Sequence, residues 1–223
     1  MEHVPHSFHV HRLIFLVPDY YHEIAILDGA NGYVAGCDEA GRGPLAGPVV
    51  AAAVILPVNT EIPGLDDSKT LTEKRREVLF EKIHECALAI SVASQSAMTI
   101  DEVNIRQASL GAMRTSLAGL AITPSAALFD GRDIPVGLSA NLRKQAIIGG
   151  DGRSMSIAAA SIIAKVTRDR MLIVLDRQHA QYGFASHKGY GSAKQHQAAI
   201  KEHGGVRRVH RMSFAPFRQS ELF

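Results

Sequence analysis

The chain has 223 residues, of which 46% are hydrophobic and 21% are charged. This composition supplies enough apolar side chains for one substantial core and excludes a chain that is disordered throughout. The formal net charge is only +2, which excludes a strongly basic nucleic-acid-binding protein, so any binding of a polyanion must depend on local clusters of Lys and Arg.

The first 17 residues precede every predicted strand and helix, and we interpret them as an N-terminal extension. His6, His9 and His11 lack a cysteine or carboxylate that completes a ligand set, so they favour a flexible end over a metal site. Cys37 and Cys86 fit neither a disulfide framework nor a zinc site, and they favour a reducing compartment. No apolar run has the length of a membrane span and no signal peptide is recognisable, so we expect a cytoplasmic protein.

Apolar runs rich in Val and Ala predict strands, and apolar side chains at helical spacing predict helices. In chain order, the predicted elements are strands 33–36 and 49–56, helix 73–88 with Thr72 as its N-cap, strand 89–97, helix 99–120, strands 126–129 and 146–148, and helices 156–182 and 192–203. Because strands and helices alternate, we expect an α/β fold built on one mixed sheet.

Four carboxylates share one context, since each closes a short apolar strand and precedes glycine or a loop. They are Asp38, Glu39, Asp130 and Asp151. Ligands gather at strand ends in α/β sheets, so we expect these groups to converge. Like charges in a cleft raise one another's pKa, and a hard cation such as Mg²⁺ or Mn²⁺ removes that penalty. Two such ions about 3.5–4 Å apart form the clamp used for phosphodiester displacement.

Other interpretations of these acids stay open at the level of the residues. A single Asp before Gly is usually a turn residue, which applies to Asp130 and Asp151. Asp133, in the loop after Asp130, and Asp169, between two arginines of helix 156–182, compete for the fourth place. We prefer Asp151 because it ends a predicted strand and precedes the start of a helix.

Six motifs resemble those of bacterial ribonuclease HII, in the order of that family. They are "GCDEAGRGPLAGPVVAAAVIL", "DDSKTLTEKRRE", "LFDG", "GGDGRSMSIAAASIIAKVTRDRML", "YGFASHKGYGSAKQHQAAIKEHG" and "RVHRMSFAP". The resemblance extends from about residue 18 to residue 216. It implies a catalytic domain over 18–216, with the extension 1–17 before it and a tail, 217–223, after it.

The resemblance implies an RNase H-like fold, with a mixed central sheet flanked by helices and a C-terminal helical appendage. It implies an endonuclease that cleaves RNA in RNA–DNA hybrids and at single ribonucleotides embedded in duplex DNA. Cleavage would occur 5′ to the ribonucleotide and leave a 3′-hydroxyl and a 5′-phosphate. Two divalent ions, Mn²⁺ or Mg²⁺, would be held by Asp38, Glu39, Asp130 and Asp151. The preference for Asp151 over Asp169 rests on this resemblance as much as on physics.

The segment Gly41-Arg42-Gly43 is a candidate for reading the ribose, because glycines let main-chain groups approach the 2′-hydroxyl closely. From these residues alone, a glycine-rich connection with an exposed Arg is equally consistent. Tyr190, taken alone, is more often a partly buried anchor. The resemblance implies instead that Gly41, Arg42 and Gly43 contact the ribose, and that Tyr190 packs on the next deoxyribose and selects the RNA–DNA junction.

Polar residues near helix starts and on one helix face are candidates for phosphate binding. Ser68 and Lys69 precede a predicted helix start, a place that favours anions. Ser161 and Lys165 are four residues apart and share a helix face. We favour a phosphate contact for Lys69. For Lys165, a phosphate contact and an internal tether to a carboxylate both stay open.

Residues 188–211 contain six Lys or Arg against a single Glu. A solvated basic face is the usual explanation, and a track for the backbone of a duplex is the functional one.

The last five residues, "QSELF", resemble the short peptide with which bacterial replication proteins bind the sliding clamp. Leu222 and Phe223 would fill an apolar pocket while Gln219 makes a polar contact. The alternative is a tail that folds back onto the domain. Clamp binding through Gln219 to Phe223 is therefore a hypothesis.

Two rival functions remain. One is another metal-dependent nuclease of the same fold, such as ribonuclease HIII or a resolvase-like enzyme. The other is a duplex-binding module whose acids are structural. We expect RNA–DNA hybrid and ribonucleotide-containing duplex DNA as partners. We also expect a monomer, because the single domain contains every part that the chemistry needs.

Overall fold

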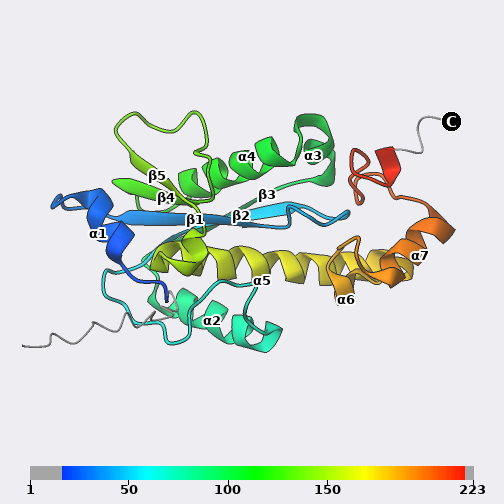
Figure 1. The fold of residues 1–223 in the computed structure, drawn as a ribbon, viewed down its shortest axis with the longest axis horizontal. Coiled ribbons are helices and arrows are strands. Elements are labelled where there is room, and N and C mark those ends of the chain that lie inside the picture. Colours follow the sequence, from blue (N-terminus) through cyan, green and yellow to red (C-terminus); the bar gives the residue numbers. More distant parts are fainter. Residues whose placement is uncertain (1–16, 219–223) are drawn as a thin grey trace, which may run out of the picture.

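The computed structural model describes residues 17–218, which form a five-stranded mixed sheet with helices on both faces (Figure 1). The strands are β1 (Val34–Ala40), β2 (Val49–Ile55), β3 (Ala89–Gln95), β4 (Ala126–Asp130) and β5 (Arg143–Ile147). The helices are α1 (Tyr21–Leu27), α2 (Glu73–Cys86), α3 (Ala97–Val103), α4 (Ile105–Ala118), α5 (Met155–Gln178), α6 (Phe184–His187) and α7 (Lys194–His203). The predicted α/β class with a mixed sheet is confirmed.

The strand order is β3-β2-β1-β4-β5. β1, β2 and β3 are antiparallel neighbours, whereas β4 and β5 run parallel to β1. Cys37 of β1 lies opposite Phe129 of β4. The next residue of each strand is therefore an aspartate, and Asp38 and Asp130 reach the same edge of the sheet.

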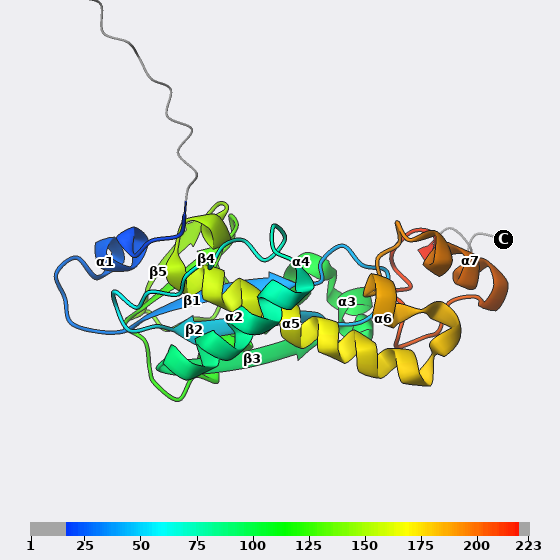
Figure 2. The same cartoon turned by 90° about the horizontal axis from the view of Figure 1, so that it is seen from below.

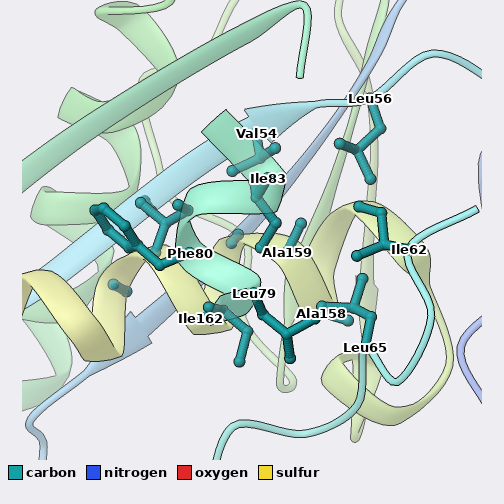
Figure 3. Close-up of a cluster of buried hydrophobic side chains, with 14 of the residues drawn as sticks. Val54, Leu56, Ile62, Leu65, Leu79, Phe80, Ile83, Ala158, Ala159 and Ile162 are labelled. Atoms are coloured by element: carbon teal, nitrogen blue, oxygen red, sulfur yellow. The ribbon is translucent and has the colours of Figure 1, made fainter. Parts of the chain in front are cut away.

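Each face of the sheet has its own hydrophobic layer, because successive side chains of a strand point to opposite faces. Ala52 and Val54 of β2 pack with α2 and α5, and Figure 3 shows Leu79, Phe80 and Ile83 meeting α5 in this layer. Alternate residues of β1 and β2 pack against α4 on the other face. Figure 2, seen from the α2–α5 side, shows both helices across the sheet.

A close approach of α5 to β1 depends on Gly36. A Cβ at this position would lie 2.1 Å from the carbonyl carbon of Ser156, which is closer than any real contact. The glycine therefore brings the start of α5 directly onto β1, and it brings the loop before α5 close to the carboxylates of β1 and β4.

The C-terminal helical appendage lies beyond the end of the sheet, where α6 lies beside the last turns of α5 and α7 and the chain that follows lie beyond them (Figure 1). Its core includes Leu172 of α5 together with Tyr182, Phe184 and Val209. Residues 45–47, which precede β2, pair with residues 209–211 through the bridge between Ala46 and His210. The appendage is thus joined to the loop that connects β1 with β2.

Several predicted bounds were wrong. α1 was not predicted. The helix expected over 99–120 is divided at Asn104, whose backbone has φ +69° and whose side chain accepts a hydrogen bond from the amide of Gln107 to begin α4. The helix expected over 156–182 ends at Gln178, because His179 leaves the helical conformation (φ −138°). β1 continues through Ala40, so Asp38 and Glu39 lie within the strand.

Within residues 17–218, no helix is both long and apolar enough to cross a membrane. The histidines of the extension and the segment "QSELF" lie outside the described residues. The division of the chain at residues 17 and 217 stays a prediction.

Candidate active site

Three carboxylates from segments far apart in the sequence converge at one edge of the sheet. Asp38 lies near the end of β1, Asp130 is the last residue of β4, and Asp151 lies in a 3₁₀ turn, Gly150–Gly152, before α5. One oxygen of each carboxylate lies within 4.8 Å of the other two. The predicted convergence of these three residues is present in the structure.

Each carboxylate is held by a hydrogen bond that leaves it facing the cluster. The amide of Glu39 donates to Asp38 Oδ1 (2.7 Å), and the amide of Gly150 donates to Asp130 Oδ1 (2.7 Å). Lys69 Nζ donates to Asp151 Oδ2 (2.9 Å). Two of the three donors are main-chain groups, so the sheet and the turn before α5 fix the geometry.

Burial and like charge act together on these acids. Burial raises the pKa of Asp38 well above its ordinary value, and the charges of Glu39, Asp130 and Asp151 raise it further. Burial also raises the pKa of Asp151, against the opposing effect of Lys69. Such a cluster binds a proton or a cation more readily than separated carboxylates do. Three oxygen ligands at this spacing fit a hard divalent cation.

Glu39 follows Asp38 in β1 and is not a member of the group of three aspartates. Its Oε1 accepts a hydrogen bond from Arg42 Nη1 at 3.2 Å. Burial raises the pKa of Glu39, whereas Arg42 lowers it. Glu39 nevertheless lines the same cavity as Asp38 and Asp130, so its carboxylate lies next to the cluster.

The two competing acids have partners of their own. Asp169 is buried in α5 and accepts a hydrogen bond from Lys165 Nζ at 2.7 Å. Asp133 forms a two-pronged ion pair with Arg106, at 2.9 and 2.6 Å. Neither belongs to the cluster of aspartates, so the geometry supports the choice of Asp151 over Asp169.

A cavity of about 320 Å³ opens beside the carboxylates, and all the predicted site residues except Asp151 line it. From the loop after β1 come Gly41, Arg42 and Gly43. From other elements come Ser68, Lys69, Ser161, Lys165 and Tyr190. The structure therefore brings together residues that the sequence separates by up to 152 positions, from Asp38 to Tyr190. Their individual roles stay predictions.

The loop that follows β1 has a conformation that requires glycine. Gly41 has φ +99°, and a Cβ there would lie 2.1 Å from Arg168 Nε. A Cβ on Gly43 would lie 3.9 Å from Tyr190 Cε1. The Tyr190 side chain, which is 42% exposed, therefore lies alongside this loop at the mouth of the cavity.

The candidate phosphate-binding residues already have partners in the protein. Ser161 Oγ donates to Ser68 Oγ at 2.7 Å, and both side chains are buried. For Lys165 the sequence left two alternatives, a phosphate contact and an internal tether to a carboxylate. Its ion pair with Asp169 is such a tether. Lys69 holds Asp151, and because its side chain is 74% exposed it also presents a positive charge to solvent at the cavity.

Two buried arginines were missed as parts of the site. Arg168 donates to the carbonyls of Pro48, Ala46 and Lys188 at 3.0–3.1 Å. It lies four residues from the buried Ala164 and Leu172 of α5, and this helical spacing was a usable signal of burial. It thus ties the loop between β1 and β2 to the Tyr190 loop.

Arg211 is fully buried and donates to the carbonyls of Gly41 (2.6 Å), Arg42 (2.9 Å) and Gly47 (3.0 and 3.1 Å). Its assignment to a surface track for the duplex was therefore wrong, as was that of Lys188, which is buried. Exposed cations of residues 188–211 do remain: Lys194, Lys201, Arg207 and Arg208. Nothing in the order of the sequence marked Arg211 as a partner of residues 41–47.

The chain resembles one family of known proteins throughout this fold. The family model described as "Ribonuclease HII" matches residues 35–217. A ribonuclease HII of Mesorhizobium japonicum is 55% identical over 201 residues, which cover 90% of this chain and 86% of the relative.

Two solved structures share the fold. The ribonuclease H2 of Pyrococcus horikoshii has a TM-score of 0.72 and 29% identity, and the match covers 85% of this chain and 97% of that one. The RNase HII of Archaeoglobus fulgidus, solved as a complex with PCNA, has a TM-score of 0.68 and 31% identity, with 82% and 95% covered.

Proposed function

Because the chain belongs to the ribonuclease HII family, we propose that its carboxylate cluster cleaves RNA–DNA hybrids and also single ribonucleotides within duplex DNA. Membership makes it an RNase H-fold nuclease that acts on the RNA strand of RNA–DNA hybrids. The proposal adds the single ribonucleotide as a substrate, the 5′ position of cleavage, and the use of two divalent ions. One observation carries it: aspartates from β1, β4 and the turn before α5 meet within 4.8 Å.

The residues at the cluster fit divalent ions, Mg²⁺ or Mn²⁺. Asp38, Asp130 and Asp151 would hold them, with Glu39 beside them. Bound ions would activate the attacking water and stabilise the leaving oxygen. Lys69 neutralises part of the charge of Asp151 and keeps a cation at the cavity, where it balances a phosphate.

Residues on the two sides of the cavity would recognise two successive sugars of the substrate. Gly41 and Gly43, on either side of Arg42, have no Cβ and so leave the main-chain groups of this segment accessible, as reading of a 2′-hydroxyl requires. The Tyr190 ring, next to Gly43, would pack on the following deoxyribose and crowd an additional hydroxyl there. Together they would select the junction between RNA and DNA.

The decisive experiment is a nicking assay on a duplex that contains one ribonucleotide, with and without Mg²⁺ or Mn²⁺. We expect the wild-type protein to cut only with the ion, 5′ to the ribonucleotide, and Asp38→Asn to lose cleavage while it still binds the duplex. Asp133→Asn is the matched control, because this acid pairs with Arg106 outside the cluster. Wild-type cleavage that does not need a divalent ion, or an Asp38→Asn variant of unchanged rate, would contradict the proposal.

A second proposal concerns the segment Gln219 to Phe223, which lies outside the described residues. We propose that it binds a sliding clamp. Its support is the motif "QSELF" together with the existence of the RNase HII–PCNA complex of A. fulgidus. Deletion of 219–223 should abolish capture by the bacterial clamp and leave nicking of free duplex unchanged. Unaltered capture would refute it.

We also propose that the protein is a monomer and that it is located in the cytoplasm. Sedimentation of the protein at micromolar concentration, with and without duplex, tests the first. Fractionation of cells that express the tagged protein tests the second.

A further inference from the structure

Two imidazoles lie completely buried beneath the loop that carries Tyr190. His196 is in the first turn of α7, and His210 is in the segment 209–211 that pairs with residues 45–47. Both have 0% exposure, and their Nε2 atoms are 3.2 Å apart. At that distance one nitrogen donates a hydrogen bond to the other.

The outer nitrogens of the pair determine where its protons lie. His210 Nδ1 faces the amide of Val206 at 3.0 Å, and an amide N–H only donates, so this nitrogen carries no proton. His196 Nδ1 faces the carbonyl of Tyr190 at 3.1 Å, and a carbonyl only accepts, so this nitrogen carries one. The proton between the two rings then belongs to His210 Nε2. Both histidines are neutral, and every hydrogen bond of the chain points toward the Tyr190 carbonyl.

The two ends of this histidine pair lie at the two loops that line the cavity. At one end, His196 fixes the main chain of Tyr190. At the other, the amide and carbonyl groups on either side of His210 bind the loop before β2, through Gly47 N to Val209 O (2.8 Å) and Arg211 N to Leu45 O (2.8 Å). The pair therefore spans from the loop between β1 and β2 to the residue that faces Gly43.

The surroundings keep the pair neutral. The rings of Tyr182, Phe184 and His187 pack around it, with His187 stacked on His196 at 4.6 Å. Burial, together with the neighbouring His196 and His179, lowers the pKa of His210 to about 4. Burial lowers the pKa of His196 as well, and His187 acts in the same direction.

We propose that His196, with its tautomer set by His210, is a positioning residue for Tyr190 and so determines how strongly the enzyme prefers a lone ribonucleotide over a continuous RNA strand. The inference rests on the proposed role of Tyr190 at the junction. The appendage would then take part in substrate selection, whereas the carboxylates would not.

The test compares two variants, His196→Asn and His196→Gln, which both lack the imidazole ring. The amide nitrogen of Asn can occupy the place of Nδ1, so His196→Asn keeps a donor for the Tyr190 carbonyl. Gln reaches the place of Nε2 instead, so His196→Gln keeps the contact with His210 and loses that donor. The measurement is the ratio of kcat/KM on a single-ribonucleotide duplex to kcat/KM on an RNA–DNA hybrid. We expect His196→Gln to lower this ratio about fivefold, the scale of one hydrogen bond, and His196→Asn to retain it.

Tyr182→Phe is the control for lost stability. It removes the hydrogen bond from Tyr182 Oη to the Gly204 carbonyl (2.8 Å) in the same cluster and leaves the Tyr190 loop alone. We expect it to lower the melting temperature without changing the ratio. A ratio that moves equally in His196→Asn and His196→Gln, or that follows melting temperature across all three variants, overturns the inference.

Three further measurements separate this inference from the proposed function. A wild-type protein that does not nick a single ribonucleotide refutes the proposed function itself. A Tyr190→Ala variant with an unchanged ratio refutes the role of Tyr190 and, with it, this inference. Nitrogen NMR of histidine-labelled protein at pH 7 reports the tautomers directly: we expect His196 protonated on Nδ1 and His210 on Nε2. The opposite assignment overturns the inference even in a protein that nicks normally.

Discussion

The carboxylate edge and the C-terminal appendage hold their functional groups by opposite means. At the edge, main-chain amides hold Asp38 and Asp130, and the side chains themselves repel one another. In the appendage, buried side chains of Arg211 and His196 hold main-chain carbonyls of irregular loops. The regular sheet can carry an unfavourable cluster of charge because its backbone is already satisfied. The irregular loops around residues 41–48 and 188–190 lack that support, and other side chains must supply it.

The largest effect should come from the edge. Asp130→Asn removes one member of the cluster, and we expect activity to fall on the order of a thousandfold, as for the loss of a group that stabilises a transition state. Because Asp130 raises the pKa of Asp38 by repulsion, the same change should raise the melting temperature measured without metal. Lower activity together with lower stability would mean that the carboxylate is a structural support, and the contrast between the two regions would fail.

In the appendage the same kind of deletion should have the opposite effect on stability. Arg211→Ala removes the donor that the carbonyls of Gly41, Arg42 and the buried Gly47 share, and we expect a loss of about 3 kcal/mol in the free energy of unfolding. Arg170→Ala is the control: this arginine is half exposed on α5 and pairs with Glu77, so its loss should cost at most about 1 kcal/mol. Urea titration of both variants measures the difference, and equal losses would contradict the assignment.

Divalent metal should stabilise the folded protein through the carboxylates of the edge and not through the appendage. At a concentration a hundredfold above its dissociation constant, Mg²⁺ should add about 2.7 kcal/mol to the free energy of unfolding of the wild-type protein. Asp151→Asn should reduce that gain, whereas Arg211→Ala should keep it, because Arg211 binds carbonyls outside the cluster. Calorimetric melts with and without the ion test this.

The smallest effect concerns pH, and the two regions should respond with opposite sign. The pKa of Asp38 is raised on folding, so the folded state binds its proton first, and acidification from neutral pH should favour the folded edge. The pKa of His210 is lowered to about 4 in the folded state. Between pH 6.5 and 4 the unfolded state therefore binds more protons than the folded state, so the free energy of unfolding should decrease as the pH is lowered.

Melting temperatures of Asp38→Asn and His210→Gln between pH 7 and 4.5, each compared with the wild type, separate the two contributions. The destabilisation caused by His210→Gln should shrink as the pH falls below 6.5, because the wild-type histidine then becomes unfavourable. The stabilisation caused by Asp38→Asn should shrink in the same interval. A constant difference in either variant would mean that the residue does not titrate differently in the two states.

The sequence revealed the edge better than the appendage for a physical reason. Asp38 lies near the end of an apolar strand and Asp130 ends another, and the local pattern of the sequence predicts both strands. Parallel pairing of these strands brings the two acids together. The choice of Asp151 rested on the family resemblance as much as on the residues, because a 3₁₀ turn leaves no periodicity. Glu39 was grouped with the others; it lines the same cavity but is not a member of the group of three aspartates, and its role stays a prediction.

The appendage depends on contacts that no local pattern encodes. Arg168 was interpreted only as a neighbour of Asp169, and Arg211 was interpreted as a surface cation. Burial of either was not expected, because an arginine is rarely buried without a partner. Apart from the Lys188 carbonyl bound by Arg168, their partners are carbonyls of residues 41–48, more than 100 positions away. The same distance in sequence concealed the pairing of residues 45–47 with residues 209–211.

The grip of Arg211 on Gly41, Arg42 and Gly47 joins the beginning of the chain to its end across 164–170 residues. During synthesis on a ribosome, the strands and α5 emerge long before this arginine does. The nascent chain can therefore assemble its acidic edge while the loop of residues 41–47 is still unsupported, and closure of that loop must be among the last events of folding. A chain truncated before residue 209 would then keep its acidic edge and lack the buried arginine that holds residues 41–47.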